Sequence, residues 1–292
     1  MITRRVALGA SAGLWFASPS LAAPGAATSD AETALRSLEQ RRGGRLGVMI
    51  LRPRDGASVS HRPDERFPMA STFKLLAAAA VLQRVDRGRE RLERRVRFTR
   101  KDLVAYSPVT EHHAGGKGLT LHELCHAAIT KSDNTAGNLL LAQIGGPAGL
   151  TAFARSLGDR LTRLDRIETG LNKATPGDPR DTTTPRAMAG DLNQLVLGDA
   201  LSPASRNQLG EWLLANSTGD ARLRAGLPAT WRVGDKTGTG DYGVTNDVAV
   251  VWPPGGEPLI ITAYFAESVA SASDRNAVIA QVGRIAARWQ AG

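Results

Sequence analysis

The sequence predicts an α/β fold of the α+β kind, with one antiparallel sheet built from both ends of the chain and a helical domain inserted between them. Strand-like apolar runs lie near the N-terminus and again beyond Pro228, whereas the segment between them is alanine-rich with helical apolar spacing. The 292 residues, 42% of them hydrophobic, suffice for one large domain or two smaller ones. The single cysteine excludes the small disulfide-stapled folds.

The first 22 residues have the pattern of a signal peptide. Met1 to Arg5 is positively charged, Val6 to Phe16 is mostly apolar and too short to cross a bilayer, and Ser20-Leu21-Ala22 offers small residues where a signal peptidase reads the chain. We expect cleavage after Ala22 and export to the periplasm or beyond. The Arg4-Arg5 pair leaves both the Sec and the twin-arginine route open.

The elements of the sheet domain follow from the apolar runs. A helix is expected over Ser29–Arg42, followed by a strand over Arg45–Leu51, and a final helix is expected from about Ser273 to Trp289. Turns rich in Gly with Asp or Pro separate three further strand candidates: Trp231–Thr237, Val244–Trp252 and Leu259–Ala266.

The helical domain lies between these strands. The pattern from Ser71 to about Ile144 is helical, and a long loop rich in Pro, Gly, Asp and Thr is expected from about Arg163 to Pro185. We place the sheet domain at residues 23–64 plus 215–292 and the all-α domain at 65–214.

The net charge of +9 comes almost entirely from two places. The segment from Arg84 to Lys101 carries eight Arg, one Lys and three acids, a net +6, and Arg4 and Arg5 add two more. The rest of the chain is close to neutral. A solvated helix face and loop explain this local basicity better than a nucleic-acid surface, so we expect no nucleic-acid partner.

A first catalytic motif is Ser71-Thr72-Phe73-Lys74, followed by the apolar run Leu75–Leu82. On a helix, Lys74 lies one turn beyond Ser71 and faces the same way. A lysine among apolar residues has a lowered pKa and can help to activate a serine hydroxyl, and a helix N-terminus favours negative charge on an acyl oxygen. Taken alone, the motif is better explained as an N-cap serine beside a snorkelling lysine.

Two further motifs follow in the chain. Ser132-Asp133-Asn134 ends a helical run that begins at Thr120, and Lys236-Thr237-Gly238 closes a strand candidate. A lysine and hydroxyls at a strand edge can hold a substrate carboxylate, and the glycine lets the substrate lie against the backbone. Each motif alone also fits a plain helix cap or a hairpin turn.

The three motifs in this order resemble the signature of the serine penicillin-recognising enzymes, most closely class A β-lactamases. The resemblance covers essentially all of the chain after residue 22. It includes Tyr106-Ser107-Pro108 and the loop from Arg163 to Asn172, which is similar to the family's omega loop, here about 163–181. It implies a five-stranded antiparallel sheet flanked by terminal helices, with the active site between sheet and all-α domain.

The resemblance also implies a mechanism. Ser71 would attack the β-lactam carbonyl, backbone N–H groups of Ser71 and Thr239 would form the oxyanion hole, and Ser132 would pass a proton to the leaving nitrogen. The base that activates Ser71 is left open between Lys74 and Glu168. Further implied site residues are Glu168 and Asn172 for the deacylating water, Tyr106, Asn134, Arg222, Lys236, Thr237, Gly238 and Thr239 for substrate binding, and the Arg166–Asp181 ion pair of the loop.

The implied function is hydrolysis of penicillins and cephalosporins, and so resistance to these antibiotics. Thr239-Gly240-Asp241 is similar to cephalosporin-active members, whereas Thr169 stands where many members carry proline. We expect a monomer that binds a small β-lactam substrate without cofactor, metal or membrane.

Three alternatives remain to be separated. A D,D-peptidase shares the acylating motifs but lacks the Glu168…Asn172 pair, and a β-lactam sensor domain stays acylated and needs an anchor or fused partner. His122-Glu123-Leu124-Cys125-His126 fits the zinc-peptidase pattern H-E-x-x-H. No histidine follows His126 as a third ligand, and Thr120 with Glu123 fits a capping box that begins a helix.

Overall fold

The computed structural model describes residues 24–292. The predicted signal peptide, with its cleavage after Ala22, lies outside these residues. Within the described part of the chain, no helix is both long enough and apolar enough to span a membrane.

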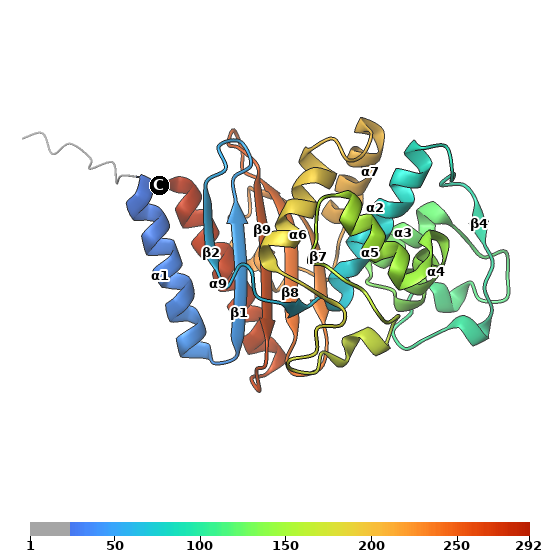
Figure 1. Cartoon of the computed structure of the whole chain (residues 1–292), viewed down its shortest axis with the longest axis horizontal. Helices are drawn as coiled ribbons and strands as arrows, with labels where there is room; N and C mark the ends of the chain where they lie inside the picture. The colour runs from blue at the N-terminus through green and yellow to red at the C-terminus, as the bar shows by residue number, and fades with distance from the viewer. Residues whose placement is uncertain (1–23) are drawn as a thin grey trace, which may run out of the picture.

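A five-stranded antiparallel sheet forms the centre of the molecule, as predicted (Figure 1). Its strand order is β2-β1-β9-β8-β7, so that the N-terminal hairpin joins the three C-terminal strands through the β1–β9 pair, and every neighbouring pair is antiparallel. The strands are β1 (Arg45–Leu51), β2 (Ser58–His61), β7 (Arg232–Thr239), β8 (Thr245–Trp252) and β9 (Leu259–Ala266).

Both faces of this sheet are covered, which explains why its strands are nearly continuous apolar runs. In β9, Ile261 and Phe265 belong to one hydrophobic core, and Ile260 and Tyr264 belong to the other. Successive side chains of a strand point to opposite faces. A strand buried on both sides therefore carries apolar residues on both of its faces.

The terminal helices cover one face of the sheet (Figure 1). They are α1 (Pro24–Arg42) and α9 (Ala272–Ala291). The short α8 (Leu223–Gly226) packs against α9 on the same face. The expectation that the first helix begins with a cap at Ser29 is wrong: Ser29 lies inside the helix, which already includes Pro24, the first described residue.

The other face carries the helical domain. Its centre is α2, in which every residue from Phe73 to Leu82 is buried. The helices are α2 (Phe73–Asp86), α3 (Leu121–Thr130), α4 (Asn134–Ile144), α5 (Gly146–Ser156), α6 (Pro185–Leu192) and α7 (Pro203–Leu214).

The predicted helical stretch from Ser71 to Ile144 is interrupted. Between α2 and α3 the chain forms only short elements, and four glycines here, among them Gly88 and Gly118, adopt positive φ or lie in turns. The short elements between α2 and α3 are β4 (Arg95–Val96) with β5 (Leu119–Thr120), and the 3₁₀ turns η2 (Arg100–Asp102) and η3 (Thr110–His112). Short elements elsewhere are β3 (Phe67–Pro68) with β6 (Thr182–Thr183), the 3₁₀ turns η1 (Ala70–Thr72) and η4 (Gly170–Lys173), and a π-helical turn, Asn193–Leu197.

The start of α2 is locked against the edge strand β7. A Cβ added at Gly238 would lie 2.7 Å from the carbonyl oxygen of Met69, so only glycine allows this approach. The side chain of Asn246 donates to the carbonyl oxygens of Pro68 and Met69, at 2.8 and 3.1 Å. These contacts place Ser71, at the beginning of the central helix, beside the end of β7.

We propose the domain boundaries given above, 23–64 plus 215–292 and 65–214. The proposal is supported by the two hydrophobic cores, one between the sheet and the terminal helices and one between the sheet and helices α2 to α7.

Two buried carboxyl groups lie close together where α6 meets the loop after α5. Asp159 Oδ1 accepts the backbone N–H groups of Leu161 and Thr162, at 2.6 and 3.0 Å, and Oδ2 of Asp159 and of Asp191 make no hydrogen bond to a donor among the described residues. Burial, reinforced by the neighbouring Asp159, raises the pKa of Asp191 well above its usual value.

We predict that Asp191→Asn stabilises the protein at high pH. An acid whose pKa is raised by folding contributes stability that is complete below its unfolded-state pKa and is lost as the pH rises through the folded-state pKa. The neutral isostere removes that loss, worth about 1–3 kcal/mol for one buried unpaired group. Thermal unfolding of wild type and variant between pH 5 and pH 9 measures it.

The control is Asp199→Asn, at an exposed aspartate of the same region. It should follow the wild-type curve. An Asp191→Asn variant that loses stability with rising pH as steeply as the wild type would contradict the prediction.

Candidate active site

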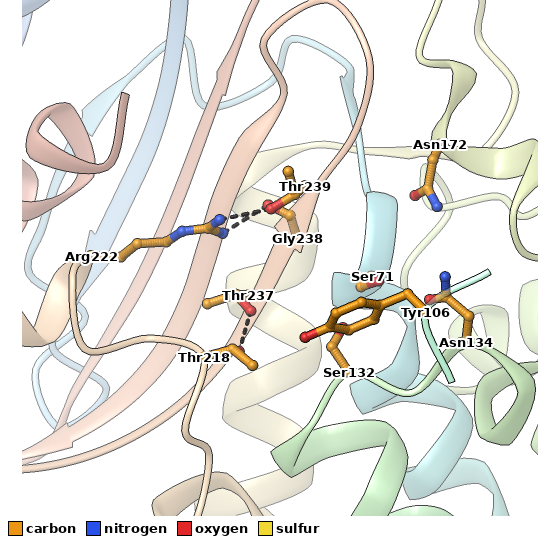
Figure 2. Close-up of a pocket in the computed structure, with 10 residues that line it drawn as sticks. All are labelled: Ser71, Tyr106, Ser132, Asn134, Asn172, Thr218, Arg222, Thr237, Gly238 and Thr239. Carbon is orange, nitrogen blue, oxygen red and sulfur yellow. Dashed lines mark hydrogen bonds between the residues drawn. The ribbon is translucent and has the colours of Figure 1, made fainter. Parts of the chain in front are cut away.

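A cavity of about 450 Å³ opens where the sheet edge meets the helical domain (Figure 2). Nine of the ten residues that line it were predicted from the sequence, and Thr218 was not. The lining consists of Ser71, Tyr106, Ser132, Asn134, Asn172, Thr218, Arg222, Thr237, Gly238 and Thr239.

Lys74 lies under the floor of this cavity, fully buried. Its Nζ donates to Ser71 Oγ at 2.9 Å, to the carbonyl oxygen of Ser132 at 2.8 Å and to Asn134 Oδ1 at 2.6 Å, and it lies 3.0 Å from Glu168 Oε1. Burial lowers the pKa of Lys74, and the negative charge of Glu168 partly opposes that shift. The predicted serine and lysine are therefore in contact, one helical turn apart.

Hydrogen bonds hold both the carboxylate and the backbone of Glu168. Its Oε1 accepts the Ser71 hydroxyl at 3.2 Å, and its Oε2 accepts from Asn172 Nδ2 at 2.5 Å. The side chain of Asn138 bonds both the N–H and the C=O of Glu168, at 2.8 and 2.9 Å. The Glu168–Thr169 peptide is cis. The carboxylate thus has a fixed position within reach of the serine.

Ser132 and Lys236 close the cavity on the side of the sheet. Lys236 Nζ donates to Ser132 Oγ at 3.1 Å and to the carbonyl oxygen of Thr237 at 2.9 Å. Burial, with the nearby charge of Lys74, lowers the pKa of Lys236 well below its usual value. Ser132 is therefore held by two buried lysines, its hydroxyl by Lys236 and its backbone carbonyl oxygen by Lys74.

The next residue of that motif, Asp133, is the N-cap of a helix. Its side chain caps α4 by accepting the N–H of Ala136 at 2.8 Å, and it also accepts the N–H groups of Val109 and Thr110, each at 2.9 Å. Ser132, immediately before it, has a positive φ of 55°. The cap thus fixes the turn that presents the serine to the cavity.

Arg222 supports the end of β7 from behind (Figure 2). Its guanidinium donates to the carbonyl oxygens of Gly238 and Asn246 at 2.8 and 2.6 Å, to Thr239 Oγ1 at 2.7 Å and to Asn276 Oδ1 at 3.0 Å. Burial lowers the pKa of Arg222. The guanidinium thus orders the strand end on which Thr237 and Thr239 stand.

Two residues predicted to contact the substrate differ in whether their side chains already have partners in the protein. Tyr106 is 62% exposed at the mouth of the cavity, with a positive φ of 62°. The Asn134 side chain is already engaged: its Oδ1 accepts from Lys74, and its Nδ2 donates to the carbonyl oxygen of Ala105 at 2.8 Å.

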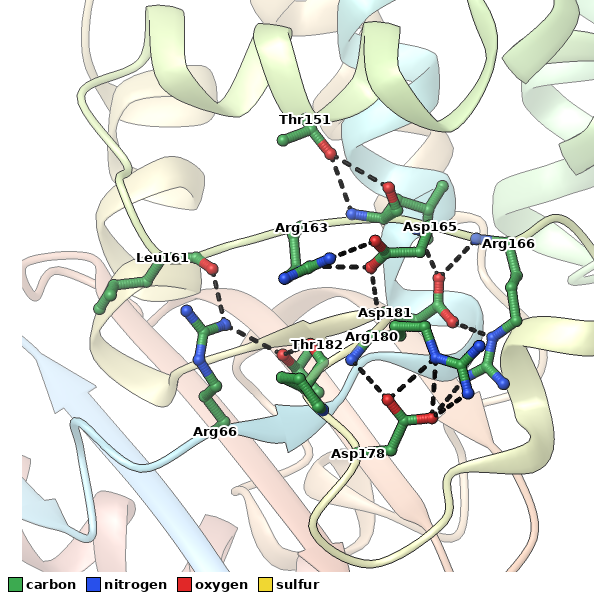
Figure 3. A network of polar contacts seen from close by, with 12 residues as sticks. Arg66, Thr151, Leu161, Arg163, Asp165, Arg166, Asp178, Arg180, Asp181 and Thr182 are labelled. Atoms are coloured by element: carbon green, nitrogen blue, oxygen red, sulfur yellow. Dashed lines mark hydrogen bonds and ion pairs between the residues drawn. The ribbon is translucent and has the colours of Figure 1, made fainter.

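A network of charges closes the loop that carries Glu168 (Figure 3). Arg166 Nε lies 2.5 Å from Asp181 Oδ2, and Asp181 Oδ1 accepts the N–H groups of Asp165 and Arg166 at 2.7 and 2.8 Å. Asp178 belongs to the same network, paired with Arg180 and Arg166, and the Arg180 hydrogen bond lowers the pKa of Asp178 to about 2.

The H-E-x-x-H segment lies away from the cavity. Thr120 and Glu123 form the predicted capping box at the start of α3, and the His122 ring packs edge-on against Trp212. In residues 24–292 no three His, Cys, Asp or Glu side chains are grouped as metal ligands. Cys125 is a buried free thiol whose pKa is raised by burial.

The fold and the cavity together define a serine hydrolase that works by acyl transfer, since a buried lysine and a glutamate both contact one serine at the start of a helix. Residues 30–290 match the family model described as "Beta-lactamase enzyme family". The chain belongs to this family: it is a class A β-lactamase, a β-lactam-hydrolysing enzyme that confers antibiotic resistance.

Curated relatives and solved structures agree. The chain is 51% identical over 251 residues to β-lactamase CTX-M-97 of Escherichia coli, covering 86% of each chain, and 50% identical over 270 residues to β-lactamase OXY-2 of Klebsiella oxytoca, covering 91% of this chain and 93% of the relative. The structure of an ancestral class A β-lactamase (GNCA) is 64% identical, with a TM-score of 0.86, and the match covers 87% of this chain and 98% of that one.

We predict that Asp181→Asn destabilises the loop that carries Glu168. The asparagine cannot hold the Arg166 charge while accepting two backbone N–H groups, and the expected loss is about 2–3 kcal/mol of unfolding free energy. Denaturant unfolding measures the loss, and faster proteolysis within residues 163–181 locates it.

Asp64→Asn is the control, because it removes an exposed acid whose ion pair with Arg186 lies at the surface, outside the loop. It should leave the unfolding midpoint close to the wild-type value. Equal effects of the two substitutions would show that Asp181 has no special role.

Proposed function

We propose that this enzyme hydrolyses penicillins and cephalosporins through an acyl-enzyme on Ser71. The observation that carries the proposal is the pair of hydrogen bonds on the Ser71 hydroxyl, from Lys74 at 2.9 Å and to Glu168 at 3.2 Å. The Glu168 carboxylate can accept the serine proton when the oxygen attacks the lactam carbonyl, and Lys74 can accept it in its neutral form, which the lowered pKa of Lys74 favours. Backbone N–H groups of Ser71 and Thr239 form the oxyanion hole.

Ser132 then returns a proton to the lactam nitrogen. Its hydroxyl accepts from Lys236 at 3.1 Å, and its carbonyl oxygen accepts from Lys74 at 2.8 Å, so both lysines contact this serine and Lys236 is in direct contact with the hydroxyl that gives the proton. The lowered pKa values of Lys74 and Lys236 make proton exchange with a hydroxyl less costly than for exposed lysines. The N–C bond of the lactam breaks as the nitrogen gains this proton.

Deacylation uses a water molecule held between Glu168 and Asn172. Glu168 takes a proton from that water, whose oxygen attacks the ester carbonyl of the acyl-enzyme, and Ser71 leaves as its hydroxyl. The short bond from Asn172 Nδ2 to Glu168 Oε2 orients the carboxylate for this task. Arg166 and Asp181 hold the loop that positions both residues.

Substrate binding involves the end of β7 and the opposite wall of the cavity. Lys236, Thr237 and Thr239 bind the substrate carboxylate, supported by Arg222, and Gly238 lets the substrate lie along the strand. Asn134 bonds the acylamide side chain, and Tyr106 forms the wall at the mouth.

Export and assembly complete the proposal. The signal-like residues 1–22 support secretion to the periplasm or beyond, with cleavage after Ala22. We propose that the mature enzyme is monomeric, since its cavity is formed by one chain alone.

We predict that Glu168→Ala accumulates an acyl-enzyme on Ser71. Lys74 still reaches the serine, so acylation continues, whereas loss of the general base slows deacylation by about 10²–10⁴-fold. Mass spectrometry of protein mixed with a penicillin should show the added mass on the peptide that contains Ser71.

The double variant Ser71→Ala with Glu168→Ala should carry no adduct. Rapid turnover by Glu168→Ala without a covalent species would exclude the role given to Glu168.

A second prediction separates the alternative enzyme classes. The purified wild-type protein should hydrolyse a chromogenic cephalosporin over many turnovers, at the same rate with and without EDTA. A stoichiometric burst that stops would indicate a peptidase or sensor, and loss of activity in EDTA would indicate a zinc enzyme.

A further inference from the structure

Thr218 lines the cavity without having a place in the mechanism above. It lies in the segment between α7 and α8, and its Oγ1 is 2.5 Å from Oγ1 of Thr237 (Figure 2). The segment is pressed against β7, because a Cβ added at the next residue, Gly219, would lie 2.1 Å from Asp235 Oδ2. Two hydroxyl groups of neighbouring segments are thus held in direct contact inside the substrate cavity.

The direction of this hydrogen bond follows from its neighbours. The backbone N–H of Thr218 can only donate, and it lies 3.1 Å from the side-chain oxygen Oδ1 of Asn216, which fixes the orientation of that amide. The amide nitrogen of Asn216 faces Asp235 at 2.5 Å, as this orientation requires. The Thr218 hydroxyl lies 2.9 Å from the same Oδ1, so it donates its single proton there.

Thr237 must therefore be the donor to Thr218. A hydroxyl carries one proton and can accept with its lone pairs. Because the Thr218 proton is used on Asn216, the 2.5 Å contact is a hydrogen bond only if Thr237 donates. In the free enzyme Thr237 consequently presents lone pairs, and no proton, to the cavity.

Thr239 has the opposite polarity. Arg222, which can only donate, lies 2.7 Å from Thr239 Oγ1, so Thr239 accepts there and its own proton is free. A carboxylate accepts hydrogen bonds and cannot donate them. A substrate carboxylate can therefore accept a hydrogen bond from Thr239 without any change, whereas at Thr237 it would face the lone pairs of the hydroxyl oxygen.

We propose that Thr218 is a positioning residue whose hydroxyl reverses direction when a substrate carboxylate binds. The proposal rests on the proposed function, which places that carboxylate beside Lys236, Thr237 and Thr239. Thr218 turns its proton from Asn216 to Thr237, and Thr237 turns its own proton to the carboxylate. No heavy atom has to move, since both changes are rotations about Cβ–Oγ1 bonds.

The hydrogen bonds remain satisfied after the reversal. Asn216 Oδ1 keeps the Thr218 N–H, and Thr237 Oγ1 accepts from Thr218 while it donates to the carboxylate. A neutral bond to Asn216 is exchanged for a charge-assisted bond to the substrate, which is about twice as strong. A hydroxyl that also accepts is a better donor, so Thr218 strengthens the grip of Thr237 on a charged substrate.

The test compares a chromogenic cephalosporin with the methyl ester of its carboxylate. Thr218→Val keeps the shape and removes the hydroxyl, and Thr218→Ser is the matched control that keeps it. Wild type should prefer the acid in kcat/KM. Thr218→Val should lower that preference about 3–10-fold through a higher KM for the acid, with kcat little changed because the carboxylate contact exists before and during the reaction.

Thr218→Ser should retain the wild-type preference, and Thr218→Ala provides a second hydroxyl-free variant should the valine fold poorly. In a Thr237→Val background, Thr218→Val should have no further effect on the preference for the acid. Without the Thr237 hydroxyl, Thr218 has no hydrogen-bonded link to the substrate carboxylate. An unchanged acid preference in a folded hydroxyl-free variant would overturn the inference. A wild type that does not prefer the acid would instead overturn the proposed carboxylate site.

Discussion

The buried Lys74 side chain is the constraint on which the rest of the site depends. A helix as apolar as α2 can accommodate an ammonium group only if acceptors surround it, because an unpaired buried charge costs several kcal/mol. Its partners come from four places: its own helix, the turn before α4, the start of α4 and the loop that carries Glu168. A Cβ added at Gly137 would lie 2.8 Å from Lys74 Cε, so α4 approaches α2 closely enough to share this lysine.

The second buried lysine, Lys236, lies in strand β7 of the sheet. Burial and the positive charge of Lys74 both lower the pKa of Lys236, whereas the pKa of Lys74 is lowered by burial. The carboxyl groups of Asp235 and Asp247 partly offset the shift at Lys236. The cavity is thus polar where protons move and is enclosed by a scaffold whose remaining side chains are largely apolar.

The sequence predicted best those features that depend on local spacing. Ser71 and Lys74 are one helical turn apart, and β1 and β9 have the predicted bounds because each is a single apolar run. β2 was not predicted, since its four residues are mostly polar and take their place only by pairing with β1. Thr218 was missed for a similar reason: threonine in a loop carries no signal until tertiary structure brings it to Thr237.

Two predictions failed or were incomplete at element boundaries, for physical reasons. Ser29 lies inside α1, because a serine within a run of good helix formers is tolerated in the helix interior. The helical pattern predicted from Ser71 to Ile144 missed the segment between α2 and α3, where glycines with positive φ, Gly88, Gly115 and Gly118, break the helix.

The central position of β9 has a consequence for how the active molecule comes into being. β1 pairs only with β2 and β9, and β9 lies between β1 and β8, so the N-terminal hairpin has no sheet to join until the last strand has been made. Ser71 and Lys236, although neighbours in the cavity, are separated by most of the chain. Closing such long loops is costly before the contacts form. A ribosome must therefore finish nearly the whole polypeptide before any of it can destroy an antibiotic, and a chain truncated before β9 is inert however well its helices fold.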